Sequence, residues 1–134
     1  MKKEKVIVMD IDGTLCPIKS TNQEYQDLFP YSDVVEKLKE YHEMGFYIIL
    51  NTSRNMRKYN GNIGLINKNT AKVLLFWLDK HAIPYDEIYY GKPWQGKGGF
   101  YVDDKTIRPD EFKKLSYDEI LDIVEPKKKW SKKN

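Results

Sequence analysis

The sequence predicts a single α/β domain with a mostly parallel sheet. Short apolar runs typical of buried strands alternate with segments whose apolar residues repeat at helical spacing. Strands that alternate with helices form right-handed βαβ units, which predicts a three-layer sandwich with helices on the faces of the sheet. The length of 134 residues fits one such domain with a core of its own.

The expected elements follow from apolar pattern and helix-ending residues. Strands are predicted over residues 5–9, 46–50, 87–90 and 100–102. Helices are predicted from Ser32 to Met44, from about residue 68 to 81, and from 116 to 124. A residue that ends helices follows each of them: Gly45 after the first, Pro84 after the second and Pro126 after the third. Residues 13–31 and 55–67 lack periodicity, and loops of that length in a compact domain usually carry function.

The positive charge of the chain is concentrated at its C-terminal end. Residues 126–134 carry five lysines and no acid, whereas the other 125 residues carry 18 basic and 20 acidic side chains. We expect residues 1–125 to form the domain and the basic tail to be a disordered end. No run of 18 apolar residues predicts membrane insertion, and the single Cys16 fits a reducing cytoplasm.

Two carboxylates mark the end of the first strand. Asp10-Ile11-Asp12-Gly13-Thr14 follows the apolar run of residues 6–9, so both acids stand at the sheet edge where open α/β folds build their sites. Like charges this close repel unless a cation lies between them or one of them holds a proton. The alternative is an Asp-Gly turn with a capping Asp. The pair favours a site for a divalent metal, a phosphate, or both.

Polar and charged residues also follow the other predicted strands. Thr52, Ser53 and Arg54 can donate hydrogen bonds to phosphoryl oxygens, and Lys92 adds a point charge. Asp103 and Asp104 supply further hard oxygen ligands of the kind Mg²⁺ prefers. Each signal alone has a structural alternative: a helix cap for Thr52 and Ser53, a loop lysine, and a capping Asp before Lys105.

Residues 91–98 (GKPWQGKG) come close to the phosphate-binding loop of nucleotide hydrolases. That pattern requires Ser or Thr at its last position, where this chain has Gly98. It also requires a following helix, whereas a short strand is predicted here. We therefore interpret the glycines as turn residues.

Taken in order, the four signals resemble the motifs of the haloacid dehalogenase superfamily: Asp-x-Asp-Gly-Thr, an apolar strand ending in Thr52, Lys92, and the pair Asp103-Asp104. The resemblance implies a Rossmann-like fold, and the short spacing between the first two motifs implies a member without a large cap domain. Residues 51–64 and 84–104 are further similar to small phosphatases associated with bacterial capsular polysaccharide biosynthesis. This similarity covers most of residues 5–115.

The resemblance also implies a role for each site residue. Asp10 is the nucleophile that forms an aspartyl-phosphate, and Asp12 is the general acid and base. Mg²⁺ lies among Asp10, the backbone carbonyl of Asp12 and Asp103, with Asp104 as a further ligand. Thr52 and Lys92 bind phosphoryl oxygens, with help from backbone amides around Gly13.

The expected activity is Mg²⁺-dependent hydrolysis of a small phosphate monoester, such as a sugar phosphate or polysaccharide precursor. One alternative is an enzyme acting on nucleic-acid ends or nucleotides, with the lysine tail holding the polymer. Another is a non-catalytic binding protein on the same fold. The ten tyrosines and three tryptophans permit an aromatic homo-oligomer interface, and the loop 55–67 is a candidate for substrate or subunit contacts.

Overall fold

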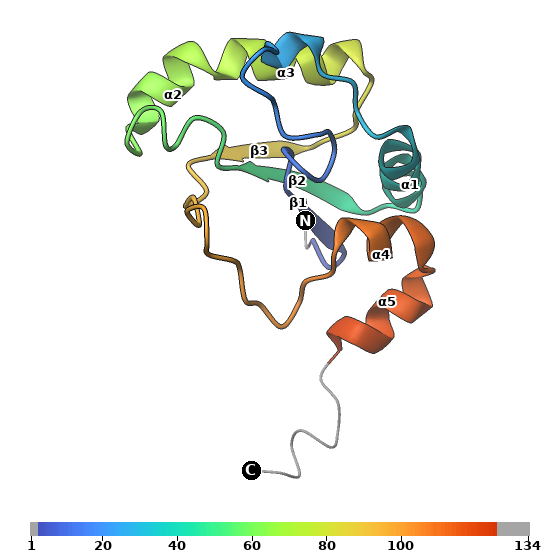
Figure 1. Cartoon of the computed structure of the whole chain (residues 1–134). Helices are drawn as coiled ribbons and strands as arrows, with labels where there is room; N and C mark the ends of the chain where they lie inside the picture. The colour runs from blue at the N-terminus through green and yellow to red at the C-terminus, as the bar shows by residue number, and fades with distance from the viewer. Residues whose placement is uncertain (1–2, 126–134) are drawn as a thin grey trace.

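Three parallel strands form the centre of the computed structural model (Figure 1). They are β1 (Val6–Met9), β2 (Tyr47–Thr52) and β3 (Glu87–Tyr90), in the spatial order β1-β2-β3. The structure describes residues 3–125; the basic tail predicted over residues 126–134 lies outside the described residues. The register places Met9 beside Leu50 and Thr52 beside Tyr90, so the carboxyl ends of all three strands meet at one edge of the sheet.

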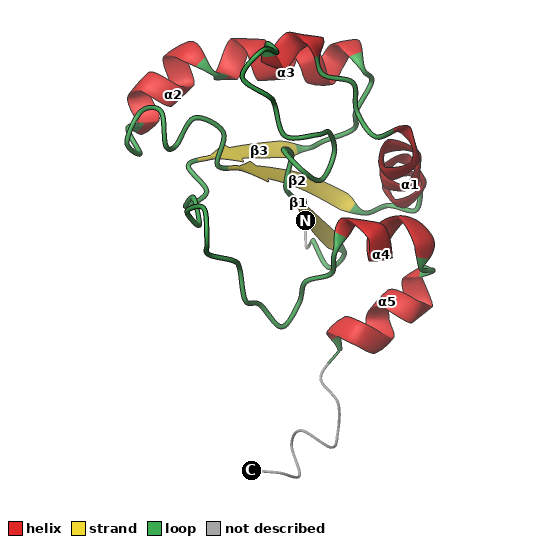
Figure 2. Cartoon of the chain, in the orientation of Figure 1, coloured by secondary structure: helices red, strands yellow, loops and turns green. Residues whose placement is uncertain are grey.

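Helices surround this sheet (Figure 2). They are α1 (Ser32–Glu43), α2 (Ile63–Asn69), α3 (Ala71–Lys80), α4 (Pro109–Lys114) and α5 (Tyr117–Val124), and a 3-10 helix, η1, spans Tyr25–Asp27. The predicted α/β class with a parallel sheet is confirmed. Among residues 3–125, no helix has the length and apolar character needed to cross a membrane.

One continuous core joins the sheet to its helices. Alternate strand residues point to one face, and Ile48 and Leu50 on that face of β2 are fully buried. Against them pack the apolar stripes of α1 (Val34, Val35, Leu38, Tyr41) and α3 (Leu74, Trp77, Leu78). Side chains on the other face are less covered, since Val8 is 61% exposed. The core therefore lies mainly between one face and the helices.

The predicted strand over residues 100–102 is wrong. The structure shows no strand there, and Phe100 and Val102 are 80% and 86% exposed. The segment is only three residues long and follows Gly96, Gly98 and Gly99, so it has little intrinsic preference for an extended ladder. Within the described residues β1 pairs only with β2, and residues 91–108 form a long connection from β3 to α4 (Figure 1).

The helix predictions were correct in position but incomplete. The helices expected from Ser32 and over 116–124 are α1 and α5, and Ser116 caps α5 by accepting a hydrogen bond from Glu119 N. The helix expected from about residue 68 is split at Thr70 into α2 and α3. Because α2 begins at Ile63, it occupies part of the predicted loop 55–67; α4 was not predicted at all.

Candidate active site

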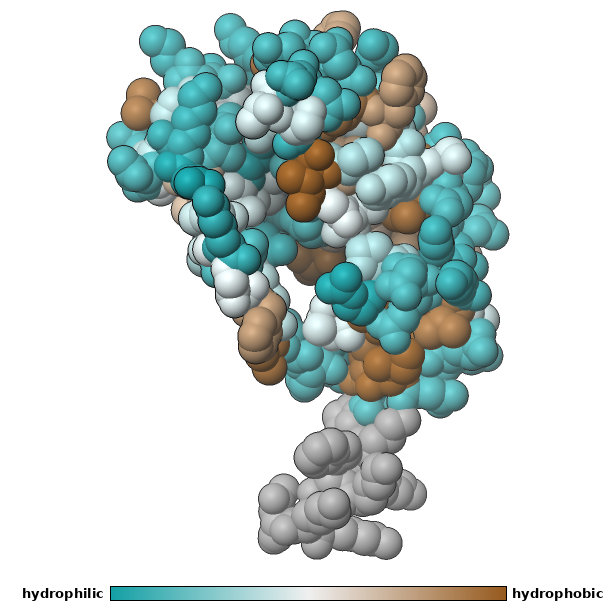
Figure 3. Space-filling view, viewed as in Figure 1, coloured by the Kyte–Doolittle hydropathy of each residue, from teal (hydrophilic) through white to brown (hydrophobic). Residues whose placement is uncertain are grey.

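The residues that follow the three strands line one cavity of about 640 Å³. Asp10 follows β1, Ser53 and Arg54 follow β2, and Lys92 follows β3. Parallel register brings these strand ends together, as the sequence predicted for this edge of the sheet. Figure 3 shows the surface hollowed between the segment that follows β3 and the rest of the molecule. A cavity of this size suits a small molecule.

A tight turn aims both carboxylates into this cavity. Ile11 between them is fully buried, and its carbonyl accepts hydrogen bonds from the backbone amides of Thr14, Leu15 and Cys16. Gly13 adopts a φ of +87°, a conformation that L residues with a side chain rarely take. The buried Ile11 and the glycine turn therefore hold Asp10 and Asp12 side by side despite their like charges.

The charge of Asp10 is compensated by Lys92. The Lys92 Nζ lies 3.6 Å from Asp10 Oδ1, and the Thr14 hydroxyl donates to Oδ2 at 3.2 Å. Burial raises the pKa of Asp10 above its ordinary value, while the Lys92 ammonium opposes that rise. The carboxylate is thus a partly desolvated anion facing a cation, a setting that suits a nucleophile or a ligand of a cation.

Asp12 is held by a different cation. Arg54 Nε donates to Asp12 Oδ2 at 3.1 Å and Nη2 donates to Oδ1 at 2.8 Å, which makes the pair bidentate. The Arg54 side chain is 1% exposed, and its guanidinium carbon lies 4.0 Å from the centre of the Tyr25 ring. Arg54, expected to bind phosphate, here fixes the orientation of the Asp12 carboxylate.

Thr52 and Ser53 occupy different environments. The Thr52 side chain is buried, and its hydroxyl accepts a hydrogen bond from the backbone amide of Arg54 at 3.0 Å. This contact forms a local turn, not the helix cap that the sequence offered as the alternative, since the next helix begins only at Ile63. Ser53 lines the cavity and Thr52 does not. Of the two hydroxyls, Ser53 is the one placed to meet a ligand in this structure.

The second acidic pair lies apart from the first. Asp103 and Asp104 are exposed, and Asp103 Oδ1 accepts a hydrogen bond from the backbone amide of Lys105 at 3.0 Å. In the part of the chain that the structure describes, no three His, Cys, Asp or Glu side chains gather where they could hold a metal. The loss of the expected strand over residues 100–102 explains this, because that strand was to carry the pair to the sheet edge.

Several residues around the site were not predicted as site residues from the sequence. Tyr25 stacks against Arg54, and the Tyr101 ring centre lies 4.5 Å from Lys92 Nζ. Trp94 and Lys19 line the cavity. For Tyr25 and Lys19, the only signal in the sequence was their position within the long predicted loop 13–31. Cys16 is fully buried, and burial raises the pKa of its thiol to about 12, so it acts as the small apolar side chain expected.

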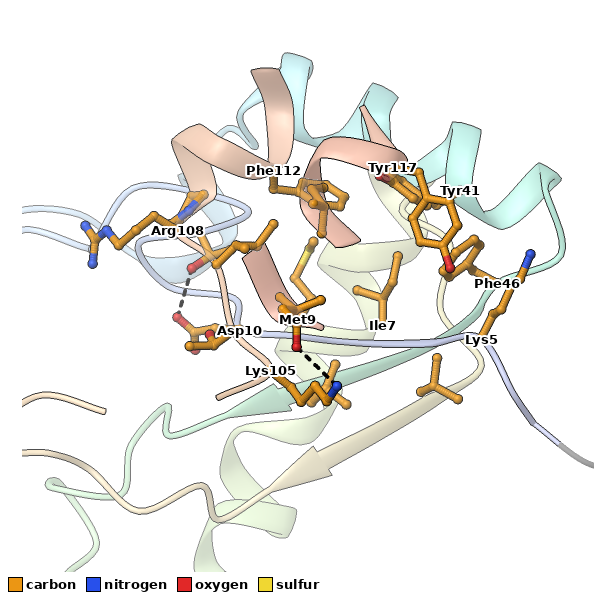
Figure 4. Close-up of a pocket in the computed structure, with 18 of the residues that line it drawn as sticks. Lys5, Ile7, Met9, Asp10, Tyr41, Phe46, Lys105, Arg108, Phe112 and Tyr117 are labelled. Carbon is orange, nitrogen blue, oxygen red and sulfur yellow. Dashed lines mark hydrogen bonds between the residues drawn. The ribbon is translucent and has the colours of Figure 1, made fainter. Parts of the chain in front are cut away.

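A second cavity, of about 470 Å³, meets the first at Asp10 and Lys92. It runs along the unpaired side of β1 beneath α4 and α5, and Figure 4 shows Ile7 and Met9 pointing toward Phe112 with Asp10 at one end. Its walls combine apolar side chains with charged ones such as Lys105, Arg108 and Glu125. The first cavity is the candidate active site because both Asp10 and Asp12 line it together with their cations, whereas the second is the space beside the edge of the sheet.

The fold and this site define an α/β protein with paired acids and cations at the carboxyl edge of a parallel sheet. A crystal structure of a Vibrio cholerae protein, MCSG Target APC26283, is similar to it throughout. The two share 47% sequence identity with a TM-score of 0.86, over 90% of this chain and 97% of that chain. The chain belongs to the same family as this Vibrio protein, whose designation names no activity.

Two other solved structures are less similar. One is D,D-heptose 1.7-bisphosphate phosphatase from B. bronchiseptica, complexed with magnesium and phosphate, at 14% identity and a TM-score of 0.46 over 70% of this chain and 53% of that chain. The other is the structure of a Pnkp1/Rnl/Hen1 complex. The match has 17% sequence identity and a TM-score of 0.49, and it covers 90% of this chain and 34% of that chain. Likenesses this weak establish no shared activity. No protein-family model matches the chain, and no curated protein matches it significantly.

Proposed function

We propose that this protein is a phosphatase of the haloacid dehalogenase type, which hydrolyses a small phosphate monoester through an aspartyl-phosphate on Asp10. The observation that carries the proposal is the arrangement of two acids, each paired with its own cation, at one edge of the sheet. Lys92 lies 3.6 Å from Asp10, and Arg54 holds Asp12 in a bidentate pair. The order of the sequence motifs supports the same reaction.

In the first step an Asp10 oxygen attacks phosphorus and the bond from phosphorus to the alcohol oxygen breaks. Asp12 carries a proton at this point, so one of its two hydrogen bonds from Arg54 gives way, and it passes that proton to the departing oxygen so that the alcohol leaves neutral. In the second step water attacks phosphorus, the bond to Asp10 breaks, and Asp12 takes the proton of that water. The products are the alcohol and inorganic phosphate, and Asp10 is regenerated. Lys92, beside Asp10, stabilises charge on the phosphoryl oxygens.

Magnesium belongs to this proposal as an expectation from the sequence. Its ligands would be Asp10 and the backbone carbonyl of Asp12, with Asp103 and Asp104 as further oxygen donors. The described arrangement does not assemble such a set, since Asp12 is engaged by Arg54 and the second acidic pair lies elsewhere. Bound Mg²⁺ would screen the acids and polarise the phosphoryl group.

The sequence resemblance to capsule-associated phosphatases extends the proposal to the substrate, the pathway, the location and the oligomeric state. We propose a sugar phosphate or polysaccharide precursor as substrate, a role in capsular polysaccharide biosynthesis, a cytoplasmic location, and a homo-oligomer whose second subunit covers the open site.

The test is phosphate release from a generic aryl phosphate, with and without Mg²⁺. Asp10→Asn should reduce kcat by roughly 10³-fold or more, because it removes the nucleophile. Chelation with EDTA should stop the reaction, and added Mg²⁺ should restore it. Asp118→Asn, an exposed acid in the first turn of α5, is the matched control and should keep the wild-type rate. Equal turnover by wild type and Asp10→Asn across a broad panel of phosphate esters would rule the proposal out.

A further inference from the structure

The candidate active site contains more positive charge than its own acids compensate. Five cationic side chains line the cavity (Lys19, Arg54, Arg57, Lys58 and Lys92), against two acids, Asp10 and Asp12. Arg54 and Lys92 are the two that pair with those acids. The other three form no salt bridge with any acid among residues 3–125. The cavity therefore has a cationic part beyond the reacting carboxylates, formed by Lys19, Arg57 and Lys58.

This part of the cavity is built by several segments rather than by one charged run. Lys19 comes from the loop after β1, Arg57 and Lys58 from the turns after β2, and Trp94 from the segment after β3. The Arg57 guanidinium carbon lies 5.2 Å from the Trp94 ring centre, and Lys19 Nζ lies 5.4 Å from that of Tyr25. Aromatic faces hold both cations at the wall of the cavity while leaving most of their hydrogen-bond donors for a ligand.

The charges of a substrate can be compared with those of the site. A phosphate monoester carries close to two negative charges at neutral pH, and Lys92 beside Asp10 is the cation placed to meet it. A substrate with a neutral remainder would leave Lys19, Arg57 and Lys58 without an anionic partner. A substrate with a second anionic group would place that group among them, in a cavity of about 640 Å³ that can hold a small metabolite.

We propose that Lys19, Arg57 and Lys58 form a subsite for a second anionic group of the substrate, a carboxylate or a second phosphate. The inference rests on the proposed phosphatase function and deepens it. The substrate class is then phosphorylated acids and bisphosphates rather than phosphate esters of neutral sugars. Arg57 determines specificity most directly, because a planar guanidinium can bind a carboxylate or phosphate through two parallel hydrogen bonds.

Two matched pairs of substrates test the subsite. Glucose 6-phosphate against 6-phosphogluconate adds a carboxylate, and fructose 6-phosphate against fructose 1,6-bisphosphate adds a phosphate. In at least one pair, kcat/KM should be about tenfold or more higher for the compound with the second anion, as one charge-assisted hydrogen bond can supply. The pair that shows the preference identifies the second group as carboxylate or phosphate. A ratio near one in both pairs overturns the subsite.

Charge-removing variants assign the preference to these residues. Arg57→Gln and Lys19→Gln should each lower the ratio within the preferred pair several-fold, mainly through KM for the doubly anionic compound. Lys72→Gln, an exposed lysine on α3 outside the cavity, should leave the ratio unchanged. If Arg57→Gln and Lys19→Gln lower kcat/KM by the same factor for both substrates of a pair, these residues act on the fold and the proposal is wrong.

Failure of the subsite is distinguishable from failure of the phosphatase. If the protein releases phosphate in an Asp10-dependent manner but shows no preference in either substrate pair, the phosphatase proposal stands and the subsite proposal is wrong. If the folded protein releases no phosphate from any of these four compounds or from an aryl phosphate, the phosphatase proposal and the subsite proposal are both wrong.

Discussion

Asp10 occupies a position where burial and ionisation oppose each other. Its pKa is raised above the ordinary value, first because of burial, and Lys92 only partly offsets that cost. A group with a higher pKa in the folded state binds its proton more tightly when folded than when unfolded. The ionised Asp10 therefore lowers folding stability at pH values above its raised pKa, and this cost disappears as pH falls through that pKa.

Replacing this acid should make the protein more stable. In the presence of EDTA at pH 7, Asp10→Asn should raise the free energy of unfolding by about 1 kcal/mol, in the range of relieved active-site strain. The gain should shrink toward zero as pH falls below the raised pKa of Asp10, because wild type then carries the proton. Urea titrations at several pH values measure the difference. Asp118→Asn should not raise the free energy of unfolding. If the increase produced by Asp10→Asn does not change with pH, the ionisation of Asp10 is not the cause of the lower stability of wild type.

At the level of the residue, the sequence predicted part of the site. Asp10, Asp12, Arg54 and Lys92 could be placed together because each follows a strand whose direction the βαβ pattern predicts. The partner of each acid could not be predicted. Whether Arg54 meets a phosphate or Asp12 depends on the path of the loop after β2, and Tyr25 reaches Arg54 from a segment that has no periodic pattern.

At the level of the element, the segment 91–108 departs most from expectation. Short apolar triplets such as residues 100–102 carry little information, since β preference depends on a partner strand that local sequence does not specify. Helices α2 and α4 were missed for a related reason: they have seven and six residues, too few for a helical period to stand out. Longer segments such as α1 and α3 show their buried stripes clearly.

Substitutions at two neighbouring glycines test whether the tight turn over residues 95–99 of this segment is formed. A Cβ at Gly99 would lie 2.2 Å from the backbone oxygen of Gln95, whereas one at Gly98 would meet nothing within 4 Å. Gly99→Ala should thus destabilise the protein by about 1–3 kcal/mol, since backbone must shift to relieve the overlap. Gly98→Ala should be neutral or stabilising by roughly 0.4–1 kcal/mol through loss of unfolded-state entropy. Urea unfolding of both variants gives the comparison, and equal effects would mean that the turn at 95–99 is not formed.

At the level of the whole molecule, one core connects segments distant in sequence. The core cluster joins Met9 of β1 and Leu50 of β2 to α1, α3 and Phe112 of α4. Trp77 of α3 is 1% exposed, and its indole N–H donates to the Leu28 carbonyl at 2.8 Å, which ties the helix to the loop after β1. Elements that share one core cannot lose their packing independently, so residues 3–125 should unfold as one cooperative unit.

This cooperativity can be measured through two probes and one core variant. In a Trp94→Phe, Trp130→Phe background, Trp77 is the single tryptophan of the sequence. Urea unfolding of this protein followed by far-ultraviolet circular dichroism and by tryptophan fluorescence should give the same midpoint, because helix content and the burial of Trp77 depend on the same core. Leu50→Ala, in the fully buried centre of β2, should cost about 2–5 kcal/mol and move both curves equally. A fluorescence change that precedes the loss of helix would instead show that α3 and the loop after β1 separate first. The candidate active site, whose walls come from that loop and from the ends of β2 and β3, would then be the least stable part of the molecule.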